Sequence, residues 1–377
     1  MYLLYAPPKK FGFIPPSEYI LTPEVRFYKN VAFCPKQYWA KIHIDQGCID
    51  ITPRTLKRIR KKRQLFRIAV VATGGIGDSL WNMPFVRYLR GKYPNATIFV
   101  ITEPKNKPVW LNFPYTNQIV SDDFYNMHNI ISRCDEVYYF GGVATMYKKY
   151  MKYDPVEAIF LMAGETPPKD KKFMRPHIVI TIEEGKRAEA LLREKGADIK
   201  KDKIISIGTE SSTNNRNWPI EYIKELSRAL INDGYKVVWL GKNEELSERL
   251  IKDENRVEGV INLVKEIPLR MAMSIISLSD LYIGPDSGLM HIAASLEIPT
   301  IGLFGAFHPK VRTKFYIKFK ALFKKIKCSP CMEHWTECPH GYPSPCMKVI
   351  TPKEVYLAAK EMLKKYPREA ITKLPIE

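Results

Sequence analysis

The sequence predicts an α/β protein in which two doubly wound, Rossmann-like domains follow one another along the chain. Three observations lead to this fold class. Short apolar runs alternate with amphipathic helical stretches, as in βαβ units. Polar or glycine-rich turns follow several of these runs, which is where doubly wound sheets bind their ligands. The length of 377 residues is about what two such domains require.

The first domain is predicted over residues 65–198. Its central strand is the continuous apolar run at 66–72, which ends in a glycine-rich turn at 73–78. A helix is expected after the turn, beginning near Pro84, because proline fits the first turn of a helix better than its interior. Further strands are predicted at 97–102 and 136–140, and further helices at 154–163 and 182–195.

The second domain is predicted over residues 199–350 and repeats the βαβ pattern. A helix at 219–230 shows apolar residues at helical spacing behind a proline in its first turn. The chain closes with a helix at 351–364, which begins with a capping box formed by Thr351 and Glu354. Strands are also predicted at 204–208, 236–240, 281–283 and 300–304, and helices at 243–250, 269–278 and 288–296.

The composition is that of a globular protein, with 45% hydrophobic and 26% charged residues, and it excludes a disordered chain or a disulfide scaffold. No apolar run approaches the roughly 18 residues of a membrane-spanning helix, and the N-terminus lacks the pattern of a signal peptide. A cytoplasmic location is therefore expected. Residues 1–64, rich in Pro, Tyr and Lys, are expected to form an irregular extension or a small β-rich cap.

The chain is strongly basic, with 59 Lys and Arg against 40 Asp and Glu and a net charge of +19. Basic residues are concentrated at 54–63 and, interleaved with aromatic residues, at 309–327. Such an excess favours an anionic partner: nucleic acid, an anionic membrane surface or a phosphorylated substrate. A lysine-rich surface without a specific partner explains the same composition.

The glycine-rich turn is the first candidate site. Gly74, Gly75 and Gly77 leave room for a ligand to approach the backbone N–H groups. Leu80 stands where a dinucleotide-binding fingerprint needs its last glycine, so the match to that fingerprint is incomplete. Asp78 follows the glycines and is placed to act as a general base. The plainer interpretation is that Asp78 caps the following helix.

The loop at 209–219 is the second candidate site. It lies between a strand and a helix N-terminus, which is a favourable position for an anion. It contains the hydroxyl groups of Ser211 and Ser212 and the guanidinium group of Arg216, and this set suits a diphosphate. The alternative is a polar loop with a solvated arginine.

The turn at 284–291 has the same position between a strand and a helix. Asp286, Ser287 and Gly288 lie where backbone N–H groups are expected to point outward. His291 follows one helical turn later and could donate a further hydrogen bond. This pattern also predicts phosphate binding, and the alternative is a capped helix with a buried, hydrogen-bonded histidine.

Four of the seven cysteines, Cys328, Cys331, Cys338 and Cys346, lie within nineteen residues. In a cytoplasmic chain such a cluster indicates metal ligands before disulfides. Four thiolates suit a structural Zn or Fe ion, which would stabilise a proline-rich loop without regular structure. Two histidines of the same loop could replace one of the thiols. Four reduced thiols packed as small apolar groups are the alternative.

Taken together and in this order, these segments resemble the ADP-heptose:lipopolysaccharide heptosyltransferase family, glycosyltransferase family nine. The resemblance runs from about residue 66 to residue 363 and leaves residues 1–64 uncovered. It rests on four segments, which include RNWPIEYIKELSRALINDGYKVVWLG and SDLYIGPDSGLMHIAASLEIPTIGLFG. The segments that carry it lie at 76–102, 216–241, 279–305 and 328–355.

The resemblance implies a GT-B fold with the acceptor on the first domain, the nucleotide sugar mainly on the second, and residues 351–377 packed back on the first. It implies an inverting transfer of a sugar that needs no divalent ion for catalysis. Asp78 then matches the general base, and Arg216 matches the basic residue that contacts the donor's phosphates. The implied nucleotide-sugar-binding residues are Gly75, Gly77, Ser211, Ser212, Asp286, Ser287, Gly288 and His291 and, by a looser alignment, Asn243 and Glu244.

The expected function is the transfer of a sugar, foremost a heptose, from an ADP-linked donor to a glycan, lipid-linked glycan or lipopolysaccharide-core acceptor. A second hypothesis keeps the fold but changes the nucleotide sugar or takes a protein as acceptor; in some relatives that modify proteins, a comparable cysteine cluster holds iron. A metal-knuckle nucleic-acid-binding protein and a catalytically inactive scaffold are hypotheses of another class. No nucleic acid is expected, because two anion sites in one cleft are not needed to bind it. The basic segments suit peripheral contact with an anionic membrane.

Overall fold

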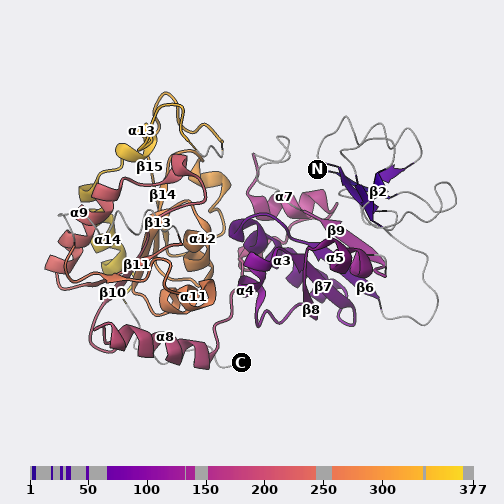
Figure 1. Ribbon diagram of the computed structural model, residues 1–377, viewed down its shortest axis with the longest axis horizontal. Coiled ribbons are helices and arrows are strands. Elements are labelled where there is room, and N and C mark those ends of the chain that lie inside the picture. The colour runs from indigo at the N-terminus through magenta and orange to yellow at the C-terminus, as the bar shows by residue number, and fades with distance from the viewer. Residues whose placement is uncertain are drawn as a thin grey trace. The chain divides into compact units, whose positions relative to one another are not determined.

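The computed structural model describes residues 2–5, 18–19, 26–28, 31–34, 48–50, 66–131, 133–140, 152–242, 257–333 and 337–367. The chain divides into two compact units, Met1–Pro176 and His177–Glu377 (Figure 1). Each unit contains one parallel sheet with helices on it, which confirms the predicted α/β class. The boundary at Pro176 precedes the predicted one at residue 198.

A separate antiparallel sheet, in the order β2-β3-β4-β1-β5, is formed by residues near the N-terminus. It agrees with the β-rich cap that was one of the two expectations for this region. The basic run at 54–63 lies outside the described residues. The strands are β1 (Tyr2–Tyr5), β2 (Glu18–Tyr19), β3 (Arg26–Tyr28), β4 (Val31–Cys34) and β5 (Ile49–Asp50).

The parallel sheet of the first unit has the strand order β8-β7-β6-β9. Its two central strands are β6 (Arg67–Val71) and β7 (Thr97–Thr102), flanked by β8 (Gln118–Ser121) and β9 (Glu136–Tyr139). β8 was not predicted, because it is short and only one of its four residues is buried. Since all four strands run in parallel, the loops that follow them meet at one end of the sheet, here called its carboxyl end.

Helices α3 (Ile76–Lys92) and α7 (Pro155–Met162) pack on one another through a buried aromatic cluster. The ring of Phe85 in α3 meets that of Phe160 in α7 edge to face, with centroids 5.2 Å apart. α3 runs through Pro84, so the expected helix start near this proline is wrong, and Gly75 is the N-cap. Buried residues on both sides of the proline hold the helix in place. The remaining elements of this unit are η1 (Pro104–Asn106), α4 (Lys107–Trp110), α5 (Phe124–Ile131) and η3 (Lys171–Met174).

The parallel sheet of the second unit has the order β12-β11-β10-β13-β14-β15, which is the strand order of a complete Rossmann sheet. The sheet of the first unit has the order of the first four of these strands. β15 (Phe319–Phe323) falls in the basic segment and was not predicted. The other strands are β10 (Ile204–Gly208), β11 (Lys236–Leu240), β12 (Ile261–Asn262), β13 (Leu281–Pro285) and β14 (Thr300–Phe304).

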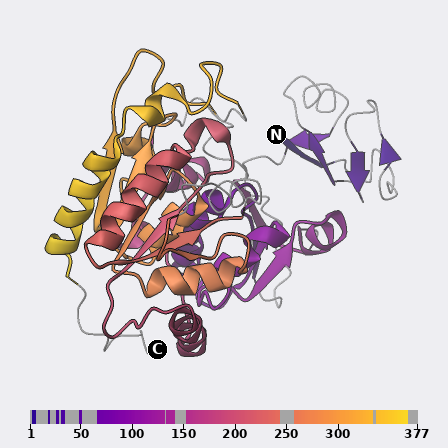
Figure 2. The same cartoon turned by 60° about the vertical axis from the view of Figure 1, so that its left-hand side comes forward.

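Helices α9 (Ile220–Asn232) and α14 (Pro352–Lys365) lie side by side on one face of this sheet (Figure 2). The closing segment was expected to pack back on the first domain, and this stays a prediction; α14 itself belongs to the second unit. Its apolar stripe, including Val355 and Met362, is buried in the core of the second unit. Residues 368–377 lie outside the described residues. The other helices are α8 (Ile182–Glu194), α11 (Leu269–Ser277), α12 (Gly288–Ser295) and α13 (Pro345–Lys348), with short 3-10 turns η4 (Asn214–Arg216) and η5 (Pro309–Val311).

Helix α8 was predicted to close the first domain and lies instead in the second unit. It packs on α11, and Arg270 of α11 donates a hydrogen bond from Nη2 to Glu184 of α8 at 2.7 Å. None of the described helices is both long and apolar enough to cross a membrane.

Candidate functional site

Three loops of the second unit leave the carboxyl ends of adjacent strands. Residues 209–219 follow β10, residues 286–287 join β13 to α12, and residues 305–318 follow β14. Because β10, β13 and β14 are neighbours in the sheet, the three loops meet at its carboxyl end. Doubly wound sheets bind their ligands at this place.

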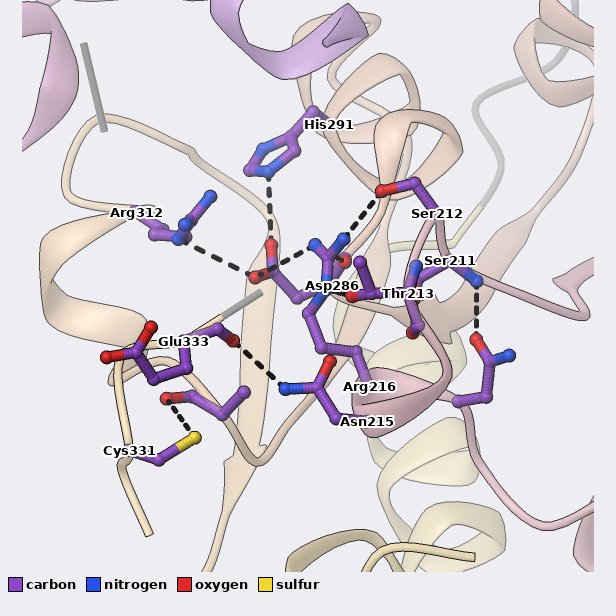
Figure 3. Close-up of polar contacts among 12 residues, drawn as sticks. Ser211, Ser212, Thr213, Asn215, Arg216, Asp286, His291, Arg312, Cys331 and Glu333 are labelled. Atoms are coloured by element: carbon purple, nitrogen blue, oxygen red, sulfur yellow. Dashed lines mark hydrogen bonds and ion pairs between the residues drawn. The ribbon is translucent and has the colours of Figure 1, made fainter. Parts of the chain in front are cut away.

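Asp286 lies at the centre of this end of the sheet and is 2% exposed. Its Oδ2 lies 3.6 Å from Nη1 of Arg216 and 3.6 Å from Nε of Arg312, and the two arginines reach it from opposite sides (Figure 3). Its Oδ1 lies 3.2 Å from Nε2 of His291. Burial alone would raise the pKa of Asp286, but the adjacent cations and His291 hold it well below its ordinary value. Asp286 is therefore an ionised carboxylate between two guanidinium groups.

Arg216 ties two of the three loops together. Its Nε donates to Oγ1 of Thr213 at 2.9 Å, and its Nη2 donates to Oγ of Ser212 at 2.8 Å. Its Nη1 donates to the backbone oxygen of Asp286 at 2.6 Å. The side chain is buried, which excludes the solvated arginine that was the alternative for this loop.

Ser211 and Ser212 lie in the predicted loop, and their hydroxyl groups shape it. Oγ of Ser211 donates to the backbone oxygen of Thr213 at 2.7 Å, while Ser212 accepts from Arg216. The backbone N–H of Ser211 donates to Oδ1 of Asn217 at 2.7 Å. Contact of either serine with a ligand stays a prediction.

His291 is held at both ring nitrogens by protein groups. Its Nδ1 lies 2.8 Å from the hydroxyl oxygen of Tyr316, and its Nε2 faces Asp286. Burial lowers the pKa of His291 below its ordinary value, although Asp286 acts in the opposite direction. A neutral ring that donates from Nε2 to Asp286 and accepts from Tyr316 fits this arrangement. The geometry matches the buried, hydrogen-bonded histidine that was the alternative, and phosphate contact by His291 stays a prediction.

Ser287 and Gly288 begin α12. Ser287 is the N-cap but its side chain makes no cap bond, and its Oγ is buried beside the hydroxyl group of Tyr282. Tyr282 reaches this place because Gly208 and Gly284 carry no side chain: a Cβ on Gly208 would lie 1.9 Å from the tyrosine oxygen. Close packing beneath the turn therefore fixes the N-terminus of α12.

Arg312 and Tyr316 were not singled out from the sequence. Both follow β14, in a segment whose basic and aromatic residues suggested contact with an anionic partner or, alternatively, a lysine-rich surface. Arg312 is nevertheless 5% exposed, and its Cζ lies 3.7 Å from the centroid of the Phe307 ring. The signal that could have found Arg312 is its place in the loop after β14, next to the strand that carries Asp286.

Two carboxylates accept hydrogen bonds from the backbone of the glycine-rich turn in the first unit. Oδ2 of Asp78 accepts from the backbone N–H of Gly75 at 2.8 Å, and Oε1 of Glu103 accepts from that of Gly74 at 3.1 Å. Gly74 has a φ of +119°, and a Cβ there would lie 2.7 Å from Oδ2 of Asp78, so only glycine fits. Gly77 lies inside the first turn of α3. Asp78 therefore caps α3, and its role as a general base stays a prediction.

Glu103 was not predicted and follows β7, as Asp122 follows β8. The pKa of Asp122 is raised by partial burial and by the nearby charge of Glu103. Glu103 also forms an ion pair with Lys105. The carboxyl end of the first sheet thus brings together several groups that could accept a proton.

The four cysteines of residues 328–346, here called the cysteine loop, lie close together in space. Burial, followed by the charges of Cys331, Cys338 and Cys328, raises the thiol pKa of Cys346 to about 11. All four are free thiols. Within the part of the chain that the structure describes, no three His, Cys, Asp or Glu side chains are arranged around one point as metal ligands. The thiols are near one another but do not form a finished metal site.

The cysteine loop is bound to the loop that holds Arg216. Asn215 donates from Nδ2 to the backbone oxygen of Glu333 at 2.9 Å (Figure 3), and Ser329 donates from Oγ to that of Gly305 at 2.7 Å. Trp218 donates from Nε1 to the backbone oxygen of Ile350 at 2.9 Å, just before α14. Asn243 and Glu244, the two weakly aligned site residues, lie outside the described residues.

The chain is similar in sequence to known glycosyltransferases. A sequence model of glycosyltransferase family 9 (heptosyltransferase) matches residues 146–340. Lipopolysaccharide heptosyltransferase 2 of Escherichia coli (strain K12) is 23% identical over 301 residues, which cover 64% of this chain and 84% of that protein. The enzyme of the same name from Salmonella typhimurium is 35% identical over 98 residues, which are 25% of this chain and 28% of that protein.

Solved structures show the same fold. The structure of Escherichia coli ADP-heptose lipopolysaccharide heptosyltransferase II aligns with a TM-score of 0.65 at 19% identity, covering 80% of this chain and 99% of that one. The iron-containing dodecameric glycosyltransferase TibC of enterotoxigenic Escherichia coli H10407 aligns with a TM-score of 0.59 at 15% identity, covering 85% and 79%. These likenesses establish a GT-B-like arrangement of two parallel sheets.

Proposed function

Because the chain belongs to glycosyltransferase family 9, we propose that it transfers a heptose from ADP-heptose to a glycan acceptor of the lipopolysaccharide core. The observation that carries this proposal is the buried arrangement of Arg216 and Asp286 at the N-terminus of α12. A leaving nucleoside diphosphate gains negative charge as its bond to the sugar breaks. A fixed cation and helix N–H groups stabilise charge that develops at such a place.

The choice of heptose and of ADP rests on the named relatives. The curated relatives in Escherichia coli and Salmonella typhimurium are lipopolysaccharide heptosyltransferases, and one solved structure of the same fold is named for ADP-heptose. Sequence identity to these relatives is between 19% and 35%. The family and the glycosyltransferase class predicted from the sequence are confirmed.

In the proposed reaction, the second unit holds the donor and the first unit supplies the base. Asp78 accepts the proton of the acceptor hydroxyl group as its oxygen attacks the anomeric carbon. The ADP leaves from the opposite face of the sugar, so the configuration at that carbon inverts. Arg216 and the first N–H groups of α12 stabilise the departing diphosphate.

A thermal-shift panel with ADP, GDP, UDP and CDP tests the donor site. A ligand that binds only the folded chain raises its melting temperature by mass action. We expect a selective shift with ADP, and its loss in Arg216→Ala. Arg193→Ala is the matched control, because Arg193 is 61% exposed on α8 and should leave the shift unchanged. A selective shift with another nucleotide would change the donor, and no shift with any would contradict the proposal.

The cysteine loop is proposed to hold a structural Zn or Fe ion. Support comes from the four neighbouring thiols and from TibC, a solved relative of the same fold that contains iron. Ligation would draw the thiols around one point, and no step of the reaction depends on it. Elemental analysis should find about one ion per chain, lost in Cys346→Ser and kept in Cys134→Ser, a buried thiol of the first unit. A metal-free wild type with full activity would contradict the proposal.

The basic segments are proposed to place the enzyme at an anionic membrane surface. In residues 309–327, Lys310, Lys314 and Lys318 are exposed, whereas Lys320 and Lys324 pair with acidic residues of α14. Sedimentation with vesicles should show binding that requires anionic lipid and weakens with salt. Equal sedimentation with neutral vesicles would contradict this placement.

A further inference from the structure

We propose that Asn106 is a positioning residue for the base of the sugar transfer, because it fixes the peptide group whose N–H binds Asp78. This inference rests on the proposed function, in which Asp78 accepts the proton of the acceptor hydroxyl group. The observation behind it is that two hydrogen bonds meet on one peptide group, the one between Gly74 and Gly75. Nδ2 of Asn106 donates to its oxygen at 2.9 Å, and its N–H donates to Oδ2 of Asp78 at 2.8 Å.

The peptide group between Gly74 and Gly75 needs a partner that fixes its orientation. A peptide group is planar, so its C=O and N–H turn together and point to opposite sides. A glycine on each side leaves the rotation of this plane almost unhindered, since glycine occupies both signs of φ with similar ease. In the observed orientation, Gly74 has a φ of +119° and Gly75 has a φ of −81°. The bond from Asn106 to the oxygen stabilises this orientation and thereby directs the N–H at Asp78.

Asn106 reaches this peptide group because the chain turns directly after β7. Pro104 begins the 3-10 turn η1, and the backbone N–H of Asn106 donates to the oxygen of Glu103 at 2.9 Å. At the start of this turn, Glu103 accepts from the N–H of Gly74, and at its end Asn106 donates to the oxygen of Gly74. One short turn therefore holds two successive peptide groups of the glycine-rich turn.

A purely structural role leaves two features of Asn106 unexplained. Asn106 is the N-cap of α4, where an asparagine ordinarily stabilises its own helix, but its side chain makes no cap bond. The residue is fully buried, and among the residues that the structure describes its Oδ1 has no hydrogen-bond partner, which is destabilising. The side chain thus serves the peptide group of Gly74 rather than the stability of α4.

The orientation of Asp78 matters because proton transfer depends on the place of the carboxylate. A base must lie within hydrogen-bond reach of the hydroxyl group whose proton it accepts. A misplacement of about 1 Å can lower a rate about a hundredfold. If the peptide group turned, the N–H of Gly75 would leave Oδ2, and Asp78 would lose a contact that orients it. Removal of the Asn106 side chain should therefore slow the transfer step and leave binding of the nucleotide sugar by the second unit unchanged.

A double-mutant cycle tests this role in the transfer of heptose from ADP-heptose to a heptose-deficient lipopolysaccharide core. Asn106→Ala should lower kcat about tenfold to a hundredfold, while KM for ADP-heptose changes less than about twofold. In the Asp78→Asn background, the same substitution should lower kcat less than about twofold further, because the base that Asn106 positions is already absent.

Thr102→Val is the matched control for the loss of a buried hydrogen bond at the same end of the sheet. Oγ1 of Thr102 donates to the backbone oxygen of Ala72 at 2.9 Å, and Thr102 is as fully buried as Asn106. This substitution removes a bond between the ends of β6 and β7 but none to the peptide group of Gly74. It should lower the melting temperature, as Asn106→Ala does, and change kcat less than about twofold.

Each other outcome is decisive. Unchanged kcat in Asn106→Ala overturns the inference and leaves the proposed function standing. Equal losses with and without Asp78, or an equal loss in Thr102→Val, show general loosening of the turn and also overturn it. If Asn106→Ala does not fold, Asn106→Asp replaces it in the cycle, since it keeps the shape of the side chain without the Nδ2 donor. Failure of the wild type to transfer heptose, or full activity of Asp78→Asn, overturns the proposed function itself, and this inference with it.

Discussion

At the amino end of each parallel sheet, an aspartate makes the same pair of hydrogen bonds with the central strand. In the first unit, the backbone N–H of Asp135 donates to the backbone oxygen of Arg67, and the backbone N–H of Arg67 donates to Oδ2 of Asp135. Both distances are 2.8 Å. In the second unit, Asp280 and Ile204 exchange the same two bonds, again both at 2.8 Å. The two sheets are thus set up alike where their strands begin.

The carboxyl ends differ in charge. The first unit has Asp78 and Glu103 on the N–H groups of its glycine-rich turn, whereas the second has Arg216 and Arg312 around one buried carboxylate, Asp286. The shared architecture supplies a place for a ligand, and the loops decide its charge. One unit is suited to accept a proton, and the other is suited to hold an anion.

The largest expected effect is that of Asp286→Asn, which removes the buried negative charge between Arg216 and Arg312. Two buried guanidinium groups would then face one another without their carboxylate, which should cost about 3–5 kcal/mol of stability. Urea unfolding followed by circular dichroism measures the loss, and ADP should restore part of it. Asp233→Asn, at an exposed carboxylate paired with Lys360, is the control. Equal stability of Asp286→Asn and the wild type would contradict a structural role for this charge.

Next comes Asp78, the proposed base of the first unit. Asp78→Asn should lower the rate of sugar transfer by about 10²–10⁴-fold and leave ADP binding intact. The substitution removes a proton acceptor but no contact with the nucleotide sugar. Glu103→Gln, at the same end of the sheet, should retain most of the activity. The two rates are compared by mass spectrometry of the glycosylated acceptor. A larger loss in Glu103→Gln would assign the base to Glu103 instead.

Substitution of one glycine in each unit tests which constraints shape the carboxyl end of its parallel sheet. Gly208→Ala and Gly74→Ala should each cost about 1–3 kcal/mol, the first by collision with Tyr282 and the second by its positive φ. Adding Tyr282→Phe should restore part of the loss in the first case, whereas adding Asp78→Ala should not restore the second. Thermal unfolding measures all four. Gly91→Ala, with nothing within 4 Å of the new Cβ, should be neutral or stabilising.

The smallest effect lies away from both sites. Hydrogen bonds from Arg270 lower the pKa of Glu184 from 4.5 to about 2. The stability that the ionised carboxylate of Glu184 contributes to the fold is therefore present above about pH 4.5 and is lost as the pH falls toward 2. Glu184→Gln should cost about 1 kcal/mol at neutral pH, and the difference from wild type should vanish in acid. Glu189→Gln, in an ion pair with the exposed Arg193, should cost less. A difference that persists at low pH would contradict the assignment.

Much of the fold could be predicted because buried parallel strands are continuous apolar runs. The predictions at 97–102, 204–208, 236–240 and 300–304 coincide with β7, β10, β11 and β14. β15 could not be found in this way, because it is an edge strand of half-buried residues and its apolar run is interrupted by Lys320. The start of α3 was misjudged since tertiary burial outweighs the cost of Pro84 within the helix.

The candidate site could be predicted only where its residues are neighbours in sequence. Asp286, Ser287, Gly288 and His291 form one short motif and were recognised as such. Arg312 comes from a different loop, and its importance depends on which strands are adjacent in the sheet. Single motifs do not contain that information.

The loop that holds Arg216 takes its shape from carbonyl groups that come much later in the chain. Asn215 binds the oxygen of Glu333, and Trp218 binds that of Ile350. A ribosome therefore releases Arg216 and Asp286 well before the segments that fix the loop of Arg216. A nascent chain that ends before Glu333 contains these two residues but neither of the later contacts. Completion of this loop therefore waits for the segments that contain Glu333 and Ile350.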